Sequence, residues 1–218
     1  MLDGLRDGAR VHDLTWGVVV DHARQRHEHL AVQTARVAAE YADRGVVAMG
    51  LGGDERYPPA PFANAFAIAR EAGLWSVPHA GEVAGPDSIR DALRYLLADR
   101  IGHGIRVLED TSLTAEMAHR GVPLEVCVTS NVATKTVSSI PDHPIRRLIN
   151  AGLTVTLASD DPAMFGAWLS EDYDQLRRHH DFDDNELATL ARNSVAASFA
   201  AEQRKSELLS RVDGWIRF

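Results

Sequence analysis

The sequence predicts an α/β fold in which parallel strands alternate with helices, as either a doubly wound sheet or a βα barrel. Three observations support this prediction. Short apolar runs recur along the chain, amphipathic segments bounded by Gly or Pro lie between them, and polar residues follow several of the runs. Alternation at this spacing indicates βα units joined by right-handed crossovers.

Six of the apolar runs are expected to be strands. Each is short and rich in Val, Ile or Leu, which is typical of parallel strands that are buried on both faces. The expected strands cover residues 17–21, 46–51, 74–79, 100–103, 123–127 and 153–159.

Helices are expected between these strands and after the last one. Apolar side chains recur there at helical spacing, Pro61 and Pro86 suit the first position of a helix, and Gly45, Gly73 and Gly121 suit the position after a last turn. The expected helices cover about 30–41, 61–72, 86–97, 113–117, 144–149, 187–201 and 206–215.

Composition and charge restrict the class of protein. The chain has 218 residues, 45% of them hydrophobic, and no linker or repeat, so one domain is expected over 1–218. No run approaches the roughly 18 apolar residues of a membrane helix, and no export signal opens the chain. The single Cys127 favours a reducing, cytoplasmic location. A net charge of −8 disfavours nucleic acid and anionic lipid as partners and leaves a small soluble substrate, without indicating an oligomeric state.

The residues with chemical interest stand just after the predicted strands. His79 and His103 end two of the predicted strands, and the pair Asp160-Asp161 follows a third. Because the carboxyl ends of parallel strands meet on one face, these side chains are expected to converge there. Imidazole and carboxylate ligands suit zinc. Glu82, three residues after His79, is placed to move protons near the metal without binding it.

Each of these features also has a structural interpretation. A lone His near a strand end is more often a surface or capping residue, and Asp-Asp-Pro is usually a turn or a helix N-cap. The segment around Gly53 is consistent with a plain turn. The order of the polar residues along successive strand ends favours a common site over separate structural roles.

Five motifs in this sequence resemble those of the adenosine deaminase family, which belongs to the metal-dependent amidohydrolase barrels. The resemblance extends from about Val18 to the C-terminal helices. The motifs are Gly50-Leu-Gly-Gly53-Asp-Glu, His79-Ala-Gly-Glu82, Arg100-Ile-Gly-His103-Gly, Glu125-Val-Cys-Val-Thr-Ser130-Asn131 and Ser159-Asp160-Asp161-Pro.

The resemblance implies a (β/α)8 barrel of the TIM type, of which about six of the eight βα units are present. Residues 1–218 are then a single, incomplete deaminase barrel domain with C-terminal helices. The family pattern begins with a His-x-His at the end of the first barrel strand, and no such motif stands in that place. The triplet His27-Glu28-His29 lies past a strand, and we expect it to be a solvated helix start.

The resemblance also implies a role for each site residue. His79 and Asp160 correspond to zinc ligands, with one zinc ion per site. Glu82 corresponds to the donor of a proton to purine N1, and His103 to the group that orients and helps deprotonate the attacking water. For the purine ring, Asp161 is expected to contact N7, and the backbone of Gly53 to contact N3.

The implied function is zinc-dependent hydrolytic deamination of adenosine or deoxyadenosine to inosine or deoxyinosine, with release of ammonia, in purine salvage. Two alternatives remain open: deamination of another 6-aminopurine (adenine or aminodeoxyfutalosine), and an inactive relative that only binds purines. Gly50-Leu-Gly-Gly53, where classical family members have Asp-Leu-Ala-Gly, leaves the substrate undecided. With two of the family's zinc ligands lacking, we expect the polypeptide alone to be poorly soluble or inactive, and a preceding segment to restore activity.

Overall fold

A computed structural model describes residues 1–216 of the chain. Its six strands form one parallel sheet in which each strand pairs with the next along the chain, in the order β1-β2-β3-β4-β5-β6. The strands are β1 Val18–Ala23, β2 Val46–Gly52, β3 Trp75–Ala80, β4 Ile101–His103, β5 Leu124–Val126 and β6 Val155–Leu157. The predicted α/β class and all six predicted strands are confirmed.

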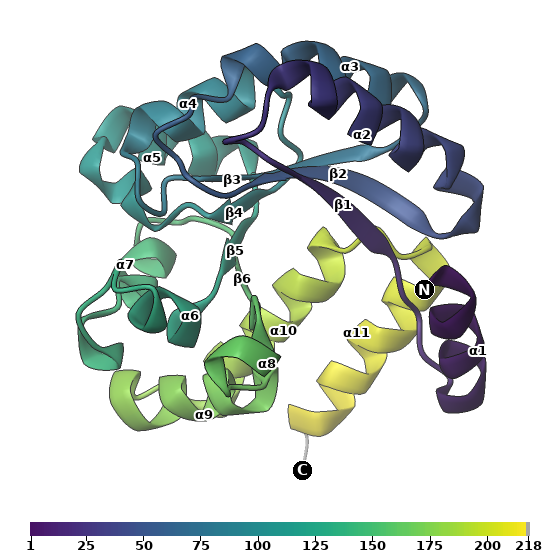
Figure 1. The fold of residues 1–218 in the computed structure, drawn as a ribbon. Coiled ribbons are helices and arrows are strands. Elements are labelled where there is room, and N and C mark those ends of the chain that lie inside the picture. Colours follow the sequence, from purple (N-terminus) through teal and green to yellow (C-terminus); the bar gives the residue numbers. More distant parts are fainter. Residues whose placement is uncertain (217–218) are drawn as a thin grey trace.

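Helices connect the strands and continue beyond the last one. They are α1 Leu2–His12, α2 Glu28–Glu40, α3 Ala63–Glu71, α4 Pro86–Tyr95, α5 Thr111–Arg120, α6 Val128–Ala133, α7 Ile145–Asn150, α8 Pro162–Phe165, α9 Leu169–His180, α10 Asp184–Ala197 and α11 Glu202–Ile216. Figure 1 shows the strands following one another around an arc, with α2, α3, α4 and α5 on its outer side. Within residues 1–216, no helix is both long and apolar enough to cross a bilayer.

The local sequence explains where the helices begin and end. Pro86 occupies the first turn of α4, where its missing N–H removes no helical hydrogen bond. At the start of α5, the Asp110 side chain accepts a hydrogen bond from the backbone N–H of Leu113, and α5 ends at Gly121 in the left-handed conformation.

Two apolar clusters hold the helices on the sheet. Around β1 and β2, the small side chains Ala31, Ala35 and Ala38 let α2 lie close to the strands. The larger cluster lies between β3–β6 and the helices that cover them, with Ile101 and Leu124 fully buried in it. Burial of this kind contributes roughly 25 cal/mol for each Å² of apolar surface.

The C-terminal segment packs against the end of the sheet at which the strands begin. The Phe199 ring stacks on Trp75 with 5.0 Å between centroids, and the Arg100 guanidinium lies 4.0 Å above the same ring. Arg100 also donates a hydrogen bond to the carbonyl oxygen of Ala197. The strand-end site on the opposite face is left clear of these contacts.

Several boundaries differ from the sequence prediction. The last predicted strand, 153–159, is shortened to β6, since the residues after Leu157 leave the sheet to build the site. Helices α1, α6, α8 and α9 were not predicted individually. The α1 helix has no buried residue, and α6 and α8 have too few turns for apolar residues at helical spacing to mark them in the sequence.

The triplet His27-Glu28-His29 lies at the beginning of α2, as predicted. His27 is the N-cap residue and its side chain is 77% exposed. The His27 and His29 rings lie 5.3 Å apart between centroids, at the surface. Neither residue belongs to the cluster of metal-binding donors described below.

Candidate active site

Three side chains that could hold a metal ion meet where β3, β4 and β6 end. His79 is the fifth residue of β3, His103 is the last residue of β4, and Asp160 follows β6. One donor atom from each lies within 4.8 Å of the others. The strand ends therefore bring His79, His103 and Asp160 into one cluster, as predicted from the order of these residues along the chain.

Two of these residues have backbone conformations that cost energy. His103 has φ 60° and Asp160 has φ 59°, in the left-handed region that side chains with a Cβ rarely adopt. Such strain persists only where the surrounding contacts hold it, and it is concentrated at functional sites. The buried His103 and the hydrogen-bonded Asp160 are both held in this way.

His79 is positioned by its backbone and by a close approach of the next strand. A Cβ on Gly102 would lie 3.2 Å from the Cα and Cγ of His79, so glycine there leaves room for the ring. The Arg24 guanidinium, which is buried, donates a hydrogen bond of 2.5 Å to the His79 carbonyl oxygen. In the described structure the buried Nδ1 of His79 has no hydrogen-bond partner. This nitrogen is available to an external ligand.

Glu82 lies in the loop after β3, beside the cluster. Its Oε1 accepts hydrogen bonds from the Asn131 amide at 3.1 Å and the Thr134 hydroxyl at 3.3 Å. Its Oε2 lies 3.5 Å from Nε2 of His103. Burial, and then the negative charge of Glu55, raise the pKa of Glu82. A carboxyl with a raised pKa is suited to donate a proton near neutral pH.

The loop that carries Glu82 is held by one buried carboxylate. Glu55 accepts hydrogen bonds from three successive backbone N–H groups, those of Glu82, Val83 and Ala84. Its side chain is buried, so the charge is compensated by these donors rather than by water. Glu55 therefore both shapes the loop and acts on the Glu82 carboxyl.

His103 is almost completely buried and neutral. Burial, and then the neighbouring His79, lower the pKa of His103 to about 4. Its Nδ1 lies 3.2 Å from the Asn131 amide nitrogen, and its Nε2 faces Glu82 and, at 3.9 Å, the Oδ2 of Asp160.

The two aspartates after β6 have different surroundings. Asp160 accepts a 2.7 Å hydrogen bond from the Ser130 hydroxyl, which turns its carboxylate towards the cluster. Asp161 is exposed and is the N-cap residue of α8, whose first residue is Pro162. The N-cap interpretation of Asp-Asp-Pro is thus correct for Asp161, whose side chain remains free to meet a ligand.

Gly53, at the end of β2, has φ +90°. A Cβ at this position would approach Oε1 of Gln25 to 2.3 Å. Only glycine fits here without a shift of Gln25, and the Gly53 backbone stays accessible from the strand-end face.

Several residues that build the site had no role predicted from the sequence. Ser130, Asn131 and Glu55 lie inside quoted motifs, so their polar character beside the candidate ligands was the available signal. Arg24 and His143 had no such signal. Neither residue lies in one of these motifs, and only the packing brings it to the site.

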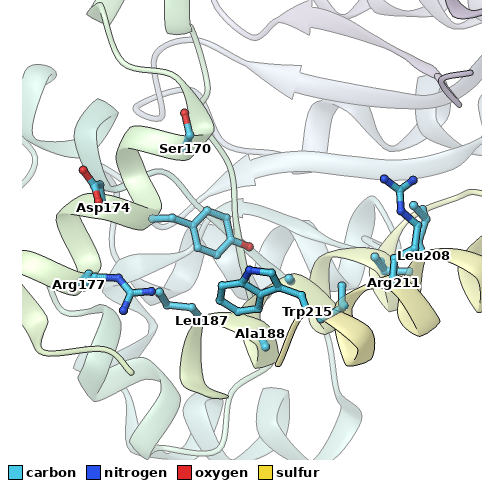
Figure 2. A pocket seen from close by; sticks show the side chains of 12 residues that line it. Ser170, Asp174, Arg177, Leu187, Ala188, Leu208, Arg211 and Trp215 are labelled. Atoms are coloured by element: carbon cyan, nitrogen blue, oxygen red, sulfur yellow. The ribbon is translucent and has the colours of Figure 1, made fainter. Parts of the chain in front are cut away.

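A separate cavity lies among α9, α10 and α11. It has a volume of about 610 Å³, and its lining includes Tyr173, Leu187, Leu208 and Trp215. Figure 2 shows Trp215 over its floor, with Arg177 and Arg211 at the sides. None of the candidate site residues lines this cavity.

A parallel βα arc that gathers imidazoles and a carboxylate at its strand ends is the arrangement of a metal-assisted hydrolase. The sequence profile described as "Adenosine deaminase" matches residues 1–215. This chain belongs to the adenosine deaminase family.

Similar proteins cover the whole of the chain but extend beyond it. A Streptomyces coelicolor relative named as an adenosine/adenine deaminase is 47% identical over 99% of this chain and 63% of its own length. An aminodeoxyfutalosine deaminase of Streptomyces avermitilis is 41% identical, over 97% of this chain and 61% of its own. The crystal structure of an adenine deaminase from Arthrobacter aurescens superposes with a TM-score of 0.93 at 34% identity, over 99% of this chain and 66% of that one. The chain therefore spans less than two thirds of the length of these relatives.

Proposed function

We propose that the protein hydrolytically deaminates a 6-aminopurine and releases ammonia. The first candidate substrates are adenosine and deoxyadenosine. The observation that carries the proposal is the half-buried Glu82 carboxyl, with a raised pKa, beside the cluster of His79, His103 and Asp160. A carbon that bears an amino group in an aromatic ring is a poor electrophile, so its attack by water needs both an acid on the ring and an activated water.

The donor set fits a zinc ion. His79 and Asp160 would hold it. The buried Nδ1 of His79 has no hydrogen-bond partner among the described residues, and one donor atom each of His79, His103 and Asp160 lie within 4.8 Å of one another. When bound, zinc supplies Lewis acidity that lowers the pKa of water from 15.7 to about 7.

The protein's own residues supply the remaining steps. Glu82 donates a proton to N1 of the purine, which draws electrons away from C6. The His103 ring orients the attacking water, since its Nε2 faces Glu82 and Asp160. Asp161 meets N7 and the backbone of Gly53 meets N3, and these two contacts set the ring in the site. The two protons of the attacking water complete the reaction: one replaces the proton that Glu82 gave to N1, and the other passes to the amino group, which leaves as ammonia.

The relatives favour two further substrates. They include proteins named as adenine and aminodeoxyfutalosine deaminases. In addition, this chain has Gly50-Leu-Gly-Gly53 at the place where classical family members have the acidic segment Asp-Leu-Ala-Gly. Both substrates present the same 6-aminopurine edge to Glu82 and Asp161, so the ring chemistry above applies to each.

One experiment tests the reaction and the substrate together. The protein as its gene encodes it is loaded with zinc, its metal content is measured, and ammonia release is followed with adenosine, deoxyadenosine, adenine and aminodeoxyfutalosine. The proposal predicts ammonia release on at least one of these and its loss on chelation. Purine binding without ammonia release would instead identify a non-catalytic relative.

A further inference from the structure

A chain of hydrogen bonds reaches His103 from outside the site. His143, which precedes α7, is 3% exposed and is not one of the three residues of the candidate metal cluster. Its Nδ1 lies 3.2 Å from the backbone nitrogen of Ile145. Because a backbone N–H can only donate, Nδ1 must be the acceptor, and the proton of the neutral ring lies on Nε2.

This proton determines the orientation of Asn131. Nε2 of His143 lies 3.2 Å from Oδ1 of Asn131 and donates to it. The amide NH₂ of Asn131 therefore faces the other way, towards Nδ1 of His103 at 3.2 Å and Oε1 of Glu82 at 3.1 Å. Oε1 of Glu82 also accepts a hydrogen bond from the Thr134 hydroxyl, so its role as an acceptor is consistent with this orientation of Asn131.

The last link defines the tautomer of His103. Its Nδ1 accepts from Asn131, so the proton of the neutral His103 ring lies on Nε2. This N–H points at Oε2 of Glu82, 3.5 Å away, and at Oδ2 of Asp160, 3.9 Å away. A neutral imidazole has only one N–H, and here it faces the reaction site.

We propose that His143 is a positioning residue that, through Asn131, holds His103 in its Nε2–H tautomer, so that His103 presents a hydrogen-bond donor to the oxygen of the attacking water. The proposal rests on the proposed function for its catalytic meaning, while the tautomer itself does not depend on it. It narrows the expected role of His103. A ring that carries its proton on Nε2 orients the water and stabilises negative charge on its oxygen, but it does not take the water's proton while it stays neutral.

The tautomer can be read directly. The zinc-loaded protein, as its gene encodes it, is labelled with ¹⁵N-histidine, and long-range ¹H–¹⁵N correlation identifies which ring nitrogen of His103 carries the proton. A His103→Gln variant assigns the signals. We expect an Nε2–H ring in the unmodified protein. An Nδ1–H ring at His103 would overturn the proposal, whatever reaction the protein catalyses.

Variants then test His143 itself. In His143→Leu the anchor is removed, and we expect His103 to populate both tautomers and kcat to fall about tenfold while KM changes by about twofold or less. In His143→Gln the side-chain amide can accept from Ile145 and donate to Asn131, so the tautomer and most of kcat should return. His119→Leu, at an exposed histidine on α5, is the matched control.

The outcomes separate positioning from simple packing. If His143→Leu lowers the melting temperature but leaves both the His103 tautomer and kcat unchanged, His143 is a structural residue and the proposal is wrong. If no purine is deaminated and the tautomer still responds to His143→Leu but not to His119→Leu, the relay stands and the proposed function fails.

Discussion

At the scale of single residues, the site combines groups whose surroundings shift their protonation in opposite directions. Burial raises the pKa of the Glu82 carboxyl and lowers the pKa of the His103 imidazole, so both groups are neutral over a wider pH range than in water. Under the proposed function, the protonated Glu82 carboxyl holds the proton that it would donate to the purine ring.

Glu82→Gln tests the acid most directly. The amide keeps the size of the side chain and its contacts with Asn131 and Thr134, but it has no proton to donate. We expect unchanged zinc content and a kcat lower by about 10²–10⁴-fold, the usual contribution of a general acid. Metal analysis and ammonia release measure the two effects. Glu71→Gln at the exposed end of α3 is the control, and full activity of Glu82→Gln would refute the role.

Glu55→Ala should change the pH dependence of the reaction. The negative charge of Glu55 disfavours ionisation of Glu82, so its removal lowers the pKa of Glu82. The protonated, active fraction then disappears at a lower pH, and the alkaline limb of kcat/KM moves to lower pH. Asp54→Ala is the matched control, because the Asp54 carboxylate binds Arg56 and not the Glu82 loop. An unshifted limb in Glu55→Ala would show that Glu55 does not act on Glu82.

At the scale of elements, one buried side chain ties three strand ends together. Arg24 follows β1 and donates to the carbonyl oxygens of Leu51 in β2, His79 in β3 and Tyr57 in the loop after β2. The convergence of the strands therefore depends on contacts at the strand ends as well as on the apolar clusters.

Arg24→Met should destabilise this end of the sheet. Methionine fills much of the volume but leaves the three carbonyl oxygens without their donor. We expect the free energy of unfolding to fall by about 2–4 kcal/mol, a typical cost of breaking a buried polar network. Urea unfolding measures it. Arg26→Met, at an exposed position two residues further on, should change stability by less than about 0.5 kcal/mol, and an equal loss in both variants would contradict this role for Arg24.

At the scale of the whole molecule, the sheet has two edges of different character. The outer edge of β6 is covered by α10, where the Asn193 side chain donates to the Val155 carbonyl oxygen. The β1 strand is the other edge, and it exposes Val19 and Asp21. An exposed edge strand is a template for pairing with another chain.

We therefore expect a polypeptide of residues 1–218 to self-associate through β1. Light scattering over a range of concentrations should show growth in mass, and Val19→Lys should reduce it, because a charge on an edge strand opposes pairing. Val37→Lys places the same charge on an exposed position of α2 and should have no such effect. Concentration-independent monomers of the unmodified polypeptide would contradict this expectation.

The sequence by itself determined the class of the fold, the six strands and the family. The short apolar runs that predict the strands, and motifs such as His79-Ala-Gly-Glu82, are local in the chain. The sequence also predicted that His79, His103 and Asp160 lie together, since parallel strands must bring their carboxyl ends to one face. The tertiary structure alone decided what surrounds those donors. Arg24 and His143 act across the fold by single hydrogen bonds, and such long-range contacts leave no periodic or local signal in the sequence.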